Sequence, residues 1–142
     1  MSADLTLPPE AASVGAAREF VARTLAAWRL PELVDSAVLA VSELATNALL
    51  HARSQFTVSV EVPNDEIVLA VADRSTLPLH LRRYNLAATT GRGLRLVAAL
   101  TTAWGVDQLA HGKRVWCALP TTPAQLPDPT AAAYAEFDVD AW

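Results

Sequence analysis

The stretch Phe56–Ala72, FTVSVEVPNDEIVLAVA, contains two strand patterns separated by a turn signal. Apolar and polar residues alternate from Phe56 to Val62, which is the pattern of a half-buried strand. Pro63–Asp65 has the composition of a turn, and Glu66–Ala72 is almost continuously apolar, as in a strand buried on both faces. The sequence therefore predicts an antiparallel hairpin at the centre of the fold.

Helical patterns precede this hairpin, and further strand patterns follow it. Apolar residues recur at helical spacing in Ser13–Trp28 and Pro31–Ala52, which predicts two amphipathic helices. A long loop and a third helix at Gly91–Leu100 are expected next, followed by closing strands at Trp104–Leu109 and Arg114–Leu119. Helices on one face of a mixed, mainly antiparallel sheet form an α+β two-layer sandwich.

Composition favours one globular domain in a reducing compartment. The chain has 142 residues, 52% of them hydrophobic and 18% charged, and its single cysteine, Cys117, has no partner for an internal disulfide. The N-terminus lacks a signal-peptide pattern, and no continuous apolar run reaches the roughly 18 residues of a membrane span. The net charge is −4, and no basic cluster is larger than the pair Arg82-Arg83. We therefore expect a cytoplasmic protein that contacts neither a membrane nor nucleic acid directly.

The last residues differ in composition from the rest, so we divide the chain into a domain at 1–120 and a tail at 121–142. The tail contains four acidic residues and no lysine or arginine, and four of the nine prolines lie in Pro120–Thr130. A flexible acidic tail is the simpler interpretation. The alternative is that the tail docks on a partner or on the domain's own groove through Tyr134, Phe137, Val139 and Trp142, which are interleaved with acidic residues.

Three polar residues share one face of the second predicted helix. Glu43, Asn47 and His51 are spaced four apart in an otherwise apolar segment. Mg²⁺ keeps several of its waters and needs few protein ligands, so the Asn47 side-chain oxygen is a candidate ligand. Glu43 is a candidate general base for a nearby hydroxyl or water. The alternative is a solvated helix face without chemistry.

Two further elements have the residue types of a nucleotide site. Asp73 directly follows a predicted buried strand, where it either caps a turn or accepts a hydrogen bond from an adenine amino group. Gly91-Arg92-Gly93-Leu94 opens a predicted helix, where backbone N–H groups and the helix dipole favour phosphate. Arg92 could add a side-chain contact to phosphate. Each element alone also fits an ordinary turn.

Other polar residues are assigned to structure. Lys113 and Arg114 follow a predicted turn at His111-Gly112, and we expect them to be solvated there, with phosphate contact as the alternative. His51 lies near a helix C-terminus, where packing or capping is its expected role.

The order of these elements resembles the N, G1 and G2 boxes of the histidine-kinase-like ATPases (GHKL or Bergerat domains). The resemblance is closest to the short bacterial anti-sigma-factor serine/threonine kinases, and it covers about 5–120. The residues that carry it are Ser42-Glu43-Leu44, Asn47-Ala48, His51-Ala52, Val71-Ala72-Asp73, Gly91-Arg92-Gly93-Leu94 and Leu96-Val97.

This resemblance implies a Bergerat ATP-binding fold with ATP and Mg²⁺ as ligands. Asn47 would bind Mg²⁺, Glu43 would be the general base and Asp73 would contact adenine. The Gly91–Leu94 loop would shape the end of the lid that faces the phosphates. The resemblance also implies a regulatory role, in which the domain, often as a homodimer, binds a sigma factor or an anti-anti-sigma (STAS-type) protein and phosphorylates a partner serine.

The sequence departs from the family pattern directly after Asp73. The fuller G1 box reads Asp-x-Gly-x-Gly, whereas this chain has Asp73-Arg74-Ser75-Thr76-Leu77. Glycine eases backbone conformations that other residues adopt at a cost, so the adenine pocket is altered. Two functions therefore remain open: a serine/threonine kinase, and a non-catalytic module that sequesters a partner with weak or lost nucleotide binding.

Overall fold

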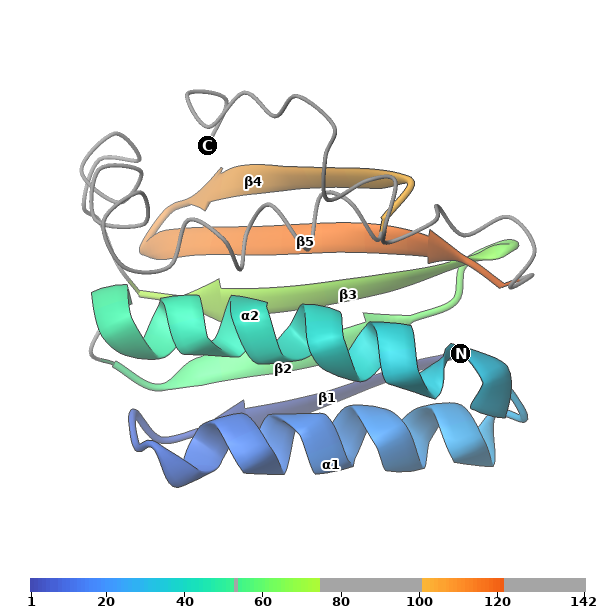
Figure 1. Cartoon of the computed structure of the whole chain (residues 1–142). Coiled ribbons are helices and arrows are strands. Elements are labelled where there is room, and N and C mark those ends of the chain that lie inside the picture. Colours follow the sequence, from blue (N-terminus) through green and yellow to red (C-terminus); the bar gives the residue numbers. More distant parts are fainter. Residues whose placement is uncertain (53, 75–100, 122–142) are drawn as a thin grey trace, which may run out of the picture.

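The computed structural model describes residues 1–52, 54–74 and 101–121 (Figure 1). Its elements follow one another along the chain as β1 (Ser2–Leu7), α1 (Ala12–Ala27), the 3₁₀-helix η1 (Pro31–Leu33), α2 (Val34–Ala52), β2 (Phe56–Glu61), β3 (Glu66–Asp73), β4 (Ala103–Leu109) and β5 (Gly112–Pro120). The third predicted helix and nearly all of the predicted tail lie outside the described residues.

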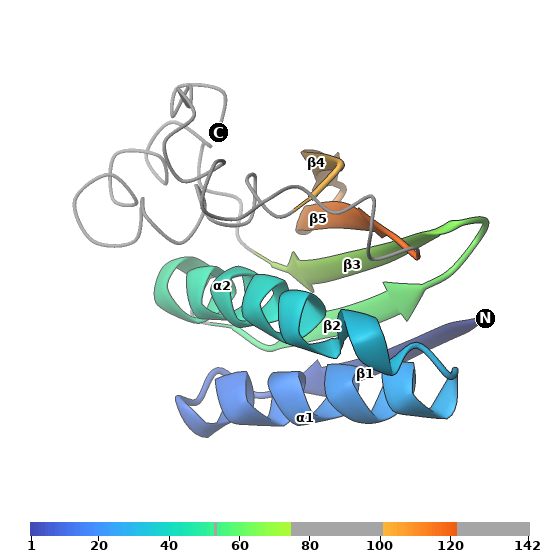
Figure 2. The same ribbon diagram turned by 45° about the vertical axis from the view of Figure 1, so that its right-hand side comes forward.

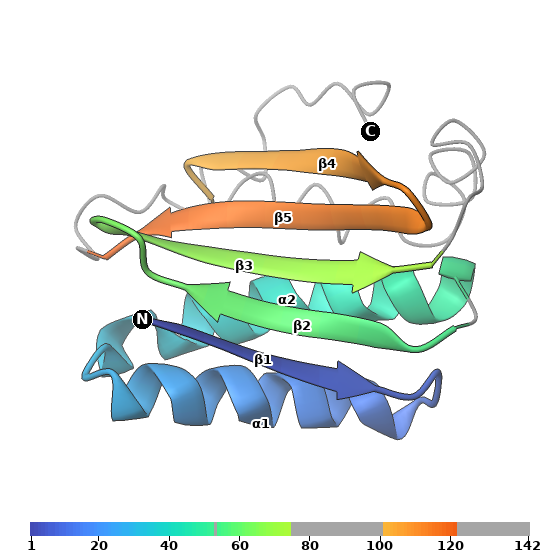
Figure 3. The same ribbon diagram turned by 180° about the vertical axis from the view of Figure 1, so that it is seen from behind.

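The five described strands form one sheet in the order β1-β2-β3-β5-β4 (Figure 3). Every neighbouring pair in this sheet is antiparallel. Figure 2 shows the two long helices as one layer beside the sheet, with α1 next to β1 and α2 next to β2 and β3. The predicted α+β two-layer sandwich is confirmed, including the central hairpin of β2 and β3.

Strand β1 at the edge of the sheet is an element that the sequence analysis did not predict. Its residues pair with β2 in a regular register in which Leu5 lies opposite Val58. Exposure alternates along the strand, and Ala3, Leu5 and Leu7 are its less exposed side chains. The period-2 signal is therefore present, but it extends over only six residues at the chain terminus.

The core lies between the helix layer and the sheet. Residues spaced three and four apart on the helices meet alternate residues of the strands, which is how a helical stripe and a pleated face become complementary. The fully or almost fully buried apolar side chains include Ala17, Val21, Leu25, Leu33, Val41, Leu44, Phe56, Val58, Val60, Ile67, Leu69, Val71, Val115, Cys117 and Leu119. Burial of each larger one contributes about 1.5–3 kcal/mol before conformational entropy is subtracted.

Helix α1 ends in a Schellman motif in which a non-glycine residue adopts the left-handed conformation. Arg29 has φ 61°. Its N–H donates to the Ala26 carbonyl at 3.1 Å, and the Leu30 N–H donates to the Leu25 carbonyl at 2.8 Å. These two bonds satisfy carbonyls that the helix end leaves open. The chain then turns back into η1 and α2.

Pro31–Leu50 is apolar and long enough to cross a membrane by length and composition alone. Its apolar character has another explanation in this fold. Helix α2 packs against α1 and β3, and Ala37, Val41, Leu44 and Ala48 are buried in the shared core. It therefore has the features of a core helix.

Candidate nucleotide-binding site

Asn47 presents a buried acceptor without a hydrogen-bond partner. It lies on α2 between the core residues Leu44 and Ala48, and only 4% of its surface is exposed. Among the described residues, no donor reaches its Oδ1. A buried polar atom left unpaired costs about 1–3 kcal/mol. This oxygen is therefore suited to accept a donor or a cation from a ligand.

Glu43 lies one helical turn before Asn47 on the same helix, so the two side chains share a face. Burial raises the pKa of the Glu43 carboxyl above its ordinary value of 4.5, and the Arg18 guanidinium on α1 opposes this effect more weakly. A carboxylate with a raised pKa binds a proton more readily near neutral pH, which favours a general base. The Glu43 carboxyl that shares a face with Asn47 therefore has a pKa shifted in the direction that favours a general base.

The C-terminal half of α2 lies at the same end of the molecule as the C-terminal end of β3 and the start of β5 (Figure 1). Asp73 is the last residue of β3, and it pairs in the sheet register with Lys113 of β5. Helix α2 packs against both strands. The fold thus places Asp73 at the end of the sheet where α2 ends.

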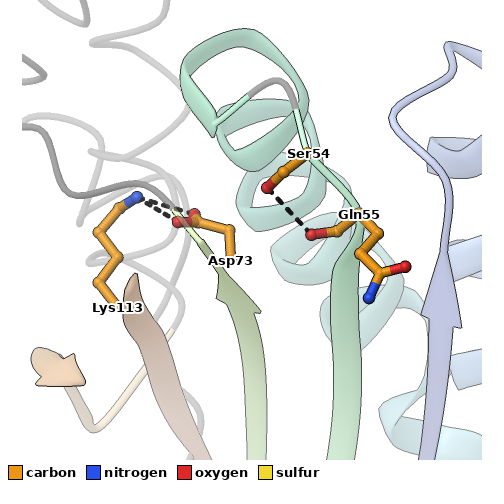
Figure 4. Close-up of polar contacts among 4 residues, drawn as sticks. All are labelled: Ser54, Gln55, Asp73 and Lys113. Atoms are coloured by element: carbon orange, nitrogen blue, oxygen red, sulfur yellow. Dashed lines mark hydrogen bonds and ion pairs between the residues drawn. The ribbon is translucent and has the colours of Figure 1, made fainter. Parts of the chain in front are cut away.

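Asp73 and Lys113 form a buried ion pair (Figure 4). The Lys113 Nζ donates to Asp73 Oδ1 at 2.6 Å and to Oδ2 at 2.8 Å. Both side chains are 1% exposed. The sequence analysis placed Lys113 in a solvated turn, and this expectation is wrong. Buried and half-buried residues alternate from Lys113 to Cys117 in β5, and Lys113 has the same strand parity as the buried residues Val115 and Cys117, so the strand period was the signal that could have revealed it.

Gly112 allows β5 to approach β3 closely beside this ion pair. It has φ +149°, and a Cβ at this position would lie 1.9 Å from the Asp73 carbonyl oxygen. No side chain fits in that space, and the backbone angle itself favours glycine. The glycine of the predicted His111-Gly112 turn therefore fixes the approach of the two backbones directly next to Asp73 and Lys113.

The two bonds from Lys113 do not by themselves use the full acceptor capacity of the Asp73 carboxylate. An ionised carboxylate has about four lone-pair sites, and Lys113 uses one on each oxygen. The predicted contact of Asp73 with adenine is therefore chemically compatible with the ion pair. The contact of Asp73 with adenine stays a prediction.

The remaining predicted site residues cannot be placed. Gly91, Arg92, Gly93 and Leu94 lie outside the described residues, as do Ser75, Thr76 and Leu77 of the altered G1 box. The side chain of His51 also lies outside the described part of the structure. Within the described ranges, no group of three or more His, Cys, Asp or Glu side chains could hold a metal ion.

Comparison with known protein families agrees with this arrangement. The model of the histidine kinase-like ATPase domain matches residues 7–119, which include α1, α2, β2, β3, β4 and all of β5 except its last residue. The chain therefore belongs to the histidine kinase-like ATPase domain family. No curated protein matches the chain significantly. The family places the protein among ATP-binding regulatory domains, and the finer resemblance to anti-sigma-factor kinases stays a prediction.

Proposed function

We propose that the protein binds ATP with Mg²⁺ between the C-terminal half of α2 and the end of β3. The unpaired Oδ1 of Asn47, buried in an otherwise apolar stretch of α2, is the observation that carries this proposal. Mg²⁺ prefers hard oxygen ligands and takes only one or two from a protein when phosphates supply the others. The donor set of this chain fits that mode of binding.

Asn47 would hold Mg²⁺ through its side-chain oxygen, and Asp73 would accept a hydrogen bond from the adenine amino group. When bound, Mg²⁺ neutralises phosphate charge during phosphoryl transfer. The Gly91–Leu94 loop, with Arg92, would contact the phosphates. These roles follow the family resemblance, with support from the burial of Asn47 and Asp73.

We further propose that the domain is a serine/threonine kinase that regulates transcription by acting on a partner protein. Glu43 would take the proton from a partner serine hydroxyl as its oxygen attacks the γ-phosphorus and the bond to the ADP oxygen breaks. The raised pKa of Glu43 supports this role. A sigma factor or a STAS-type anti-anti-sigma protein is the proposed partner, and a homodimer is the proposed assembly.

A non-catalytic module that sequesters such a partner is the second candidate. The absence of both glycines after Asp73 favours it, because the family uses that segment to shape the adenine pocket. In this case nucleotide would bind weakly or not at all, while the partner would still bind.

Two measurements separate these functions. Titration calorimetry with ADP and Mg²⁺ tests nucleotide binding, and γ-labelled ATP with a STAS-type protein tests phosphoryl transfer. We expect the wild type to bind ADP and to transfer label, whereas Glu43→Gln should bind ADP and transfer none. Binding without transfer by the wild type would favour the sequestering module, and no binding at all would contradict the nucleotide site.

A further inference from the structure

The buried ion pair at the end of β3 is unusual in its setting. The other buried residues of β3 and β5 are apolar, whereas Asp73 and Lys113 are charged. Both of their side chains are 1% exposed. Burying two charges costs several kcal/mol per ion, so such a pair contributes little net stability relative to an apolar pair. Stability alone therefore does not account for a lysine at this position.

The geometry defines the chemical state of Asp73. Lys113 donates to both carboxylate oxygens, at 2.6 and 2.8 Å, which favours the ionised form and fixes the orientation of the group. An ionised carboxylate only accepts hydrogen bonds, whereas a protonated one also donates. Lys113 therefore keeps the Asp73 carboxylate a hydrogen-bond acceptor for a base that lies next to it.

Resting on the nucleotide-binding function above, we propose that Lys113 is a positioning residue that makes the base site selective for a purine with an amino group at C6. Adenine offers an N–H donor there, which the Asp73 carboxylate accepts. Hypoxanthine offers a carbonyl oxygen at the same place, which an acceptor-only group repels. Lys113 acts through Asp73 and not by contact with the base.

A purely structural role for the pair makes a different prediction. If Lys113 only joins β5 to β3, its removal lowers the stability of the fold and reduces the affinity for all nucleotides by the same factor. If it holds Asp73 as an acceptor, its removal lets the buried carboxyl take up a proton. The carboxyl can then donate to a carbonyl oxygen, so the preference between the two bases changes.

The test compares ADP with inosine diphosphate, both with Mg²⁺, by titration calorimetry on the full chain. We expect the wild type to bind ADP at least about tenfold more tightly, because a site built for one hydrogen bond rejects the analogue that lacks it. Lys113→Met should reduce that ratio about tenfold. Lys113→Arg, which keeps the charge and two donors, should retain the wild-type ratio. Arg114→Met removes a charge from the neighbouring position, where Arg114 pairs with the exposed Asp107 at 3.3 Å, and should change nothing.

A double variant covers the case in which Lys113→Met does not fold. Asp73→Asn combined with Lys113→Met removes both charges and leaves an amide that both donates and accepts, so its ratio should approach one. A wild-type ratio in Lys113→Met would overturn the role of Lys113. A wild-type ratio in the double variant would overturn the contact of Asp73 with the base, on which that role depends. Absence of binding of either diphosphate to the wild type would instead overturn the proposed nucleotide site, and this inference with it.

Discussion

Without nucleotide, the Asn47→Ala variant should be more stable than the wild type. With nucleotide, it should be less stable than the wild type. The change removes a buried acceptor that has no partner among the described residues, which relieves at least about 1 kcal/mol. Alanine also favours the helix by up to about 0.7 kcal/mol. The space left is about the volume of one water, so the cavity costs about 0.7 kcal/mol at ~24 cal/mol per Å³. The net gain is about 1 kcal/mol.

Nucleotide should reverse this order. ADP with Mg²⁺ at about 100 times its Kd stabilises the wild type by about 2.7 kcal/mol, and the variant loses this shift because the amide ligand is gone. The wild type should then be the more stable protein by about 1.7 kcal/mol. For a domain of this size, 1 kcal/mol corresponds to a change in Tm of roughly 2–4 °C, which thermal unfolding with and without ligand can measure.

Ser42→Ala is the matched control on the same helix. The Ser42 hydroxyl donates only to the Val38 carbonyl one turn earlier, at 2.7 Å, so its loss should leave the ligand shift unchanged. A destabilised Asn47→Ala protein without nucleotide would show that Asn47 has a structural partner. An undiminished ligand shift in that variant would show that Asn47 does not contribute to the site. Either result refutes the reasoning.

Three further predictions follow from the described residues. Burial raises the folded-state pKa of Glu43 above 4.5, so ionised Glu43 opposes folding. The stability gained in Glu43→Gln should therefore grow as the pH increases from 4.5 and level off above the folded-state pKa. Urea unfolding of both proteins at pH 4 and pH 7 measures this gain, and a gain that shrinks as the pH rises contradicts the prediction. Burial raises the pKa of the Cys117 thiol to about 12, so a thiol reagent at pH 8 should label Cys117 only after unfolding; rapid labelling of the native protein would refute this. Arg29→Gly should raise the free energy of unfolding by roughly 0.5–1 kcal/mol, because glycine adopts the left-handed conformation of Arg29 without the cost of a Cβ; a loss of stability would count against this account of the α1 terminus.

Periodicity predicted most of the described fold because its signal is local. The stripes on the two helices and the alternation in β2 each extend over enough residues to define a period. Strand β1 was not predicted because it is short and its stabilising partner, β2, lies 49 to 59 residues away along the chain. A six-residue alternation becomes a strand only through the neighbouring strand β2 that pairs with it and the helix α1 that packs against it.

The candidate site divides in the same way. Helical spacing alone predicted that Glu43 and Asn47 share a face. The position of Lys113 was predicted wrongly because lysine is almost never buried unless it is paired, and its partner is forty residues away in sequence. Only the register of β3 with β5, which places Asp73 opposite Lys113, brings the two charges together.

The buried polar residues themselves argue for a site at this end of the fold. Among the described residues, five polar or charged side chains are buried, namely Ser13, Asn47, Asp73, Thr101 and Lys113. Ser13 has an ordinary structural role, since its hydroxyl donates to the Pro8 carbonyl at 2.7 Å. Asn47, Asp73 and Lys113 differ from it, because apolar replacements of the ion pair would cost little and the Asn47 acceptor has no described partner. The Thr101 hydroxyl also has no described partner, but it precedes β4 near the end of β5, at the opposite end of the sheet. Buried polar groups that lower the stability of the free protein are expected at a ligand site, because ligand binding then stabilises the folded state.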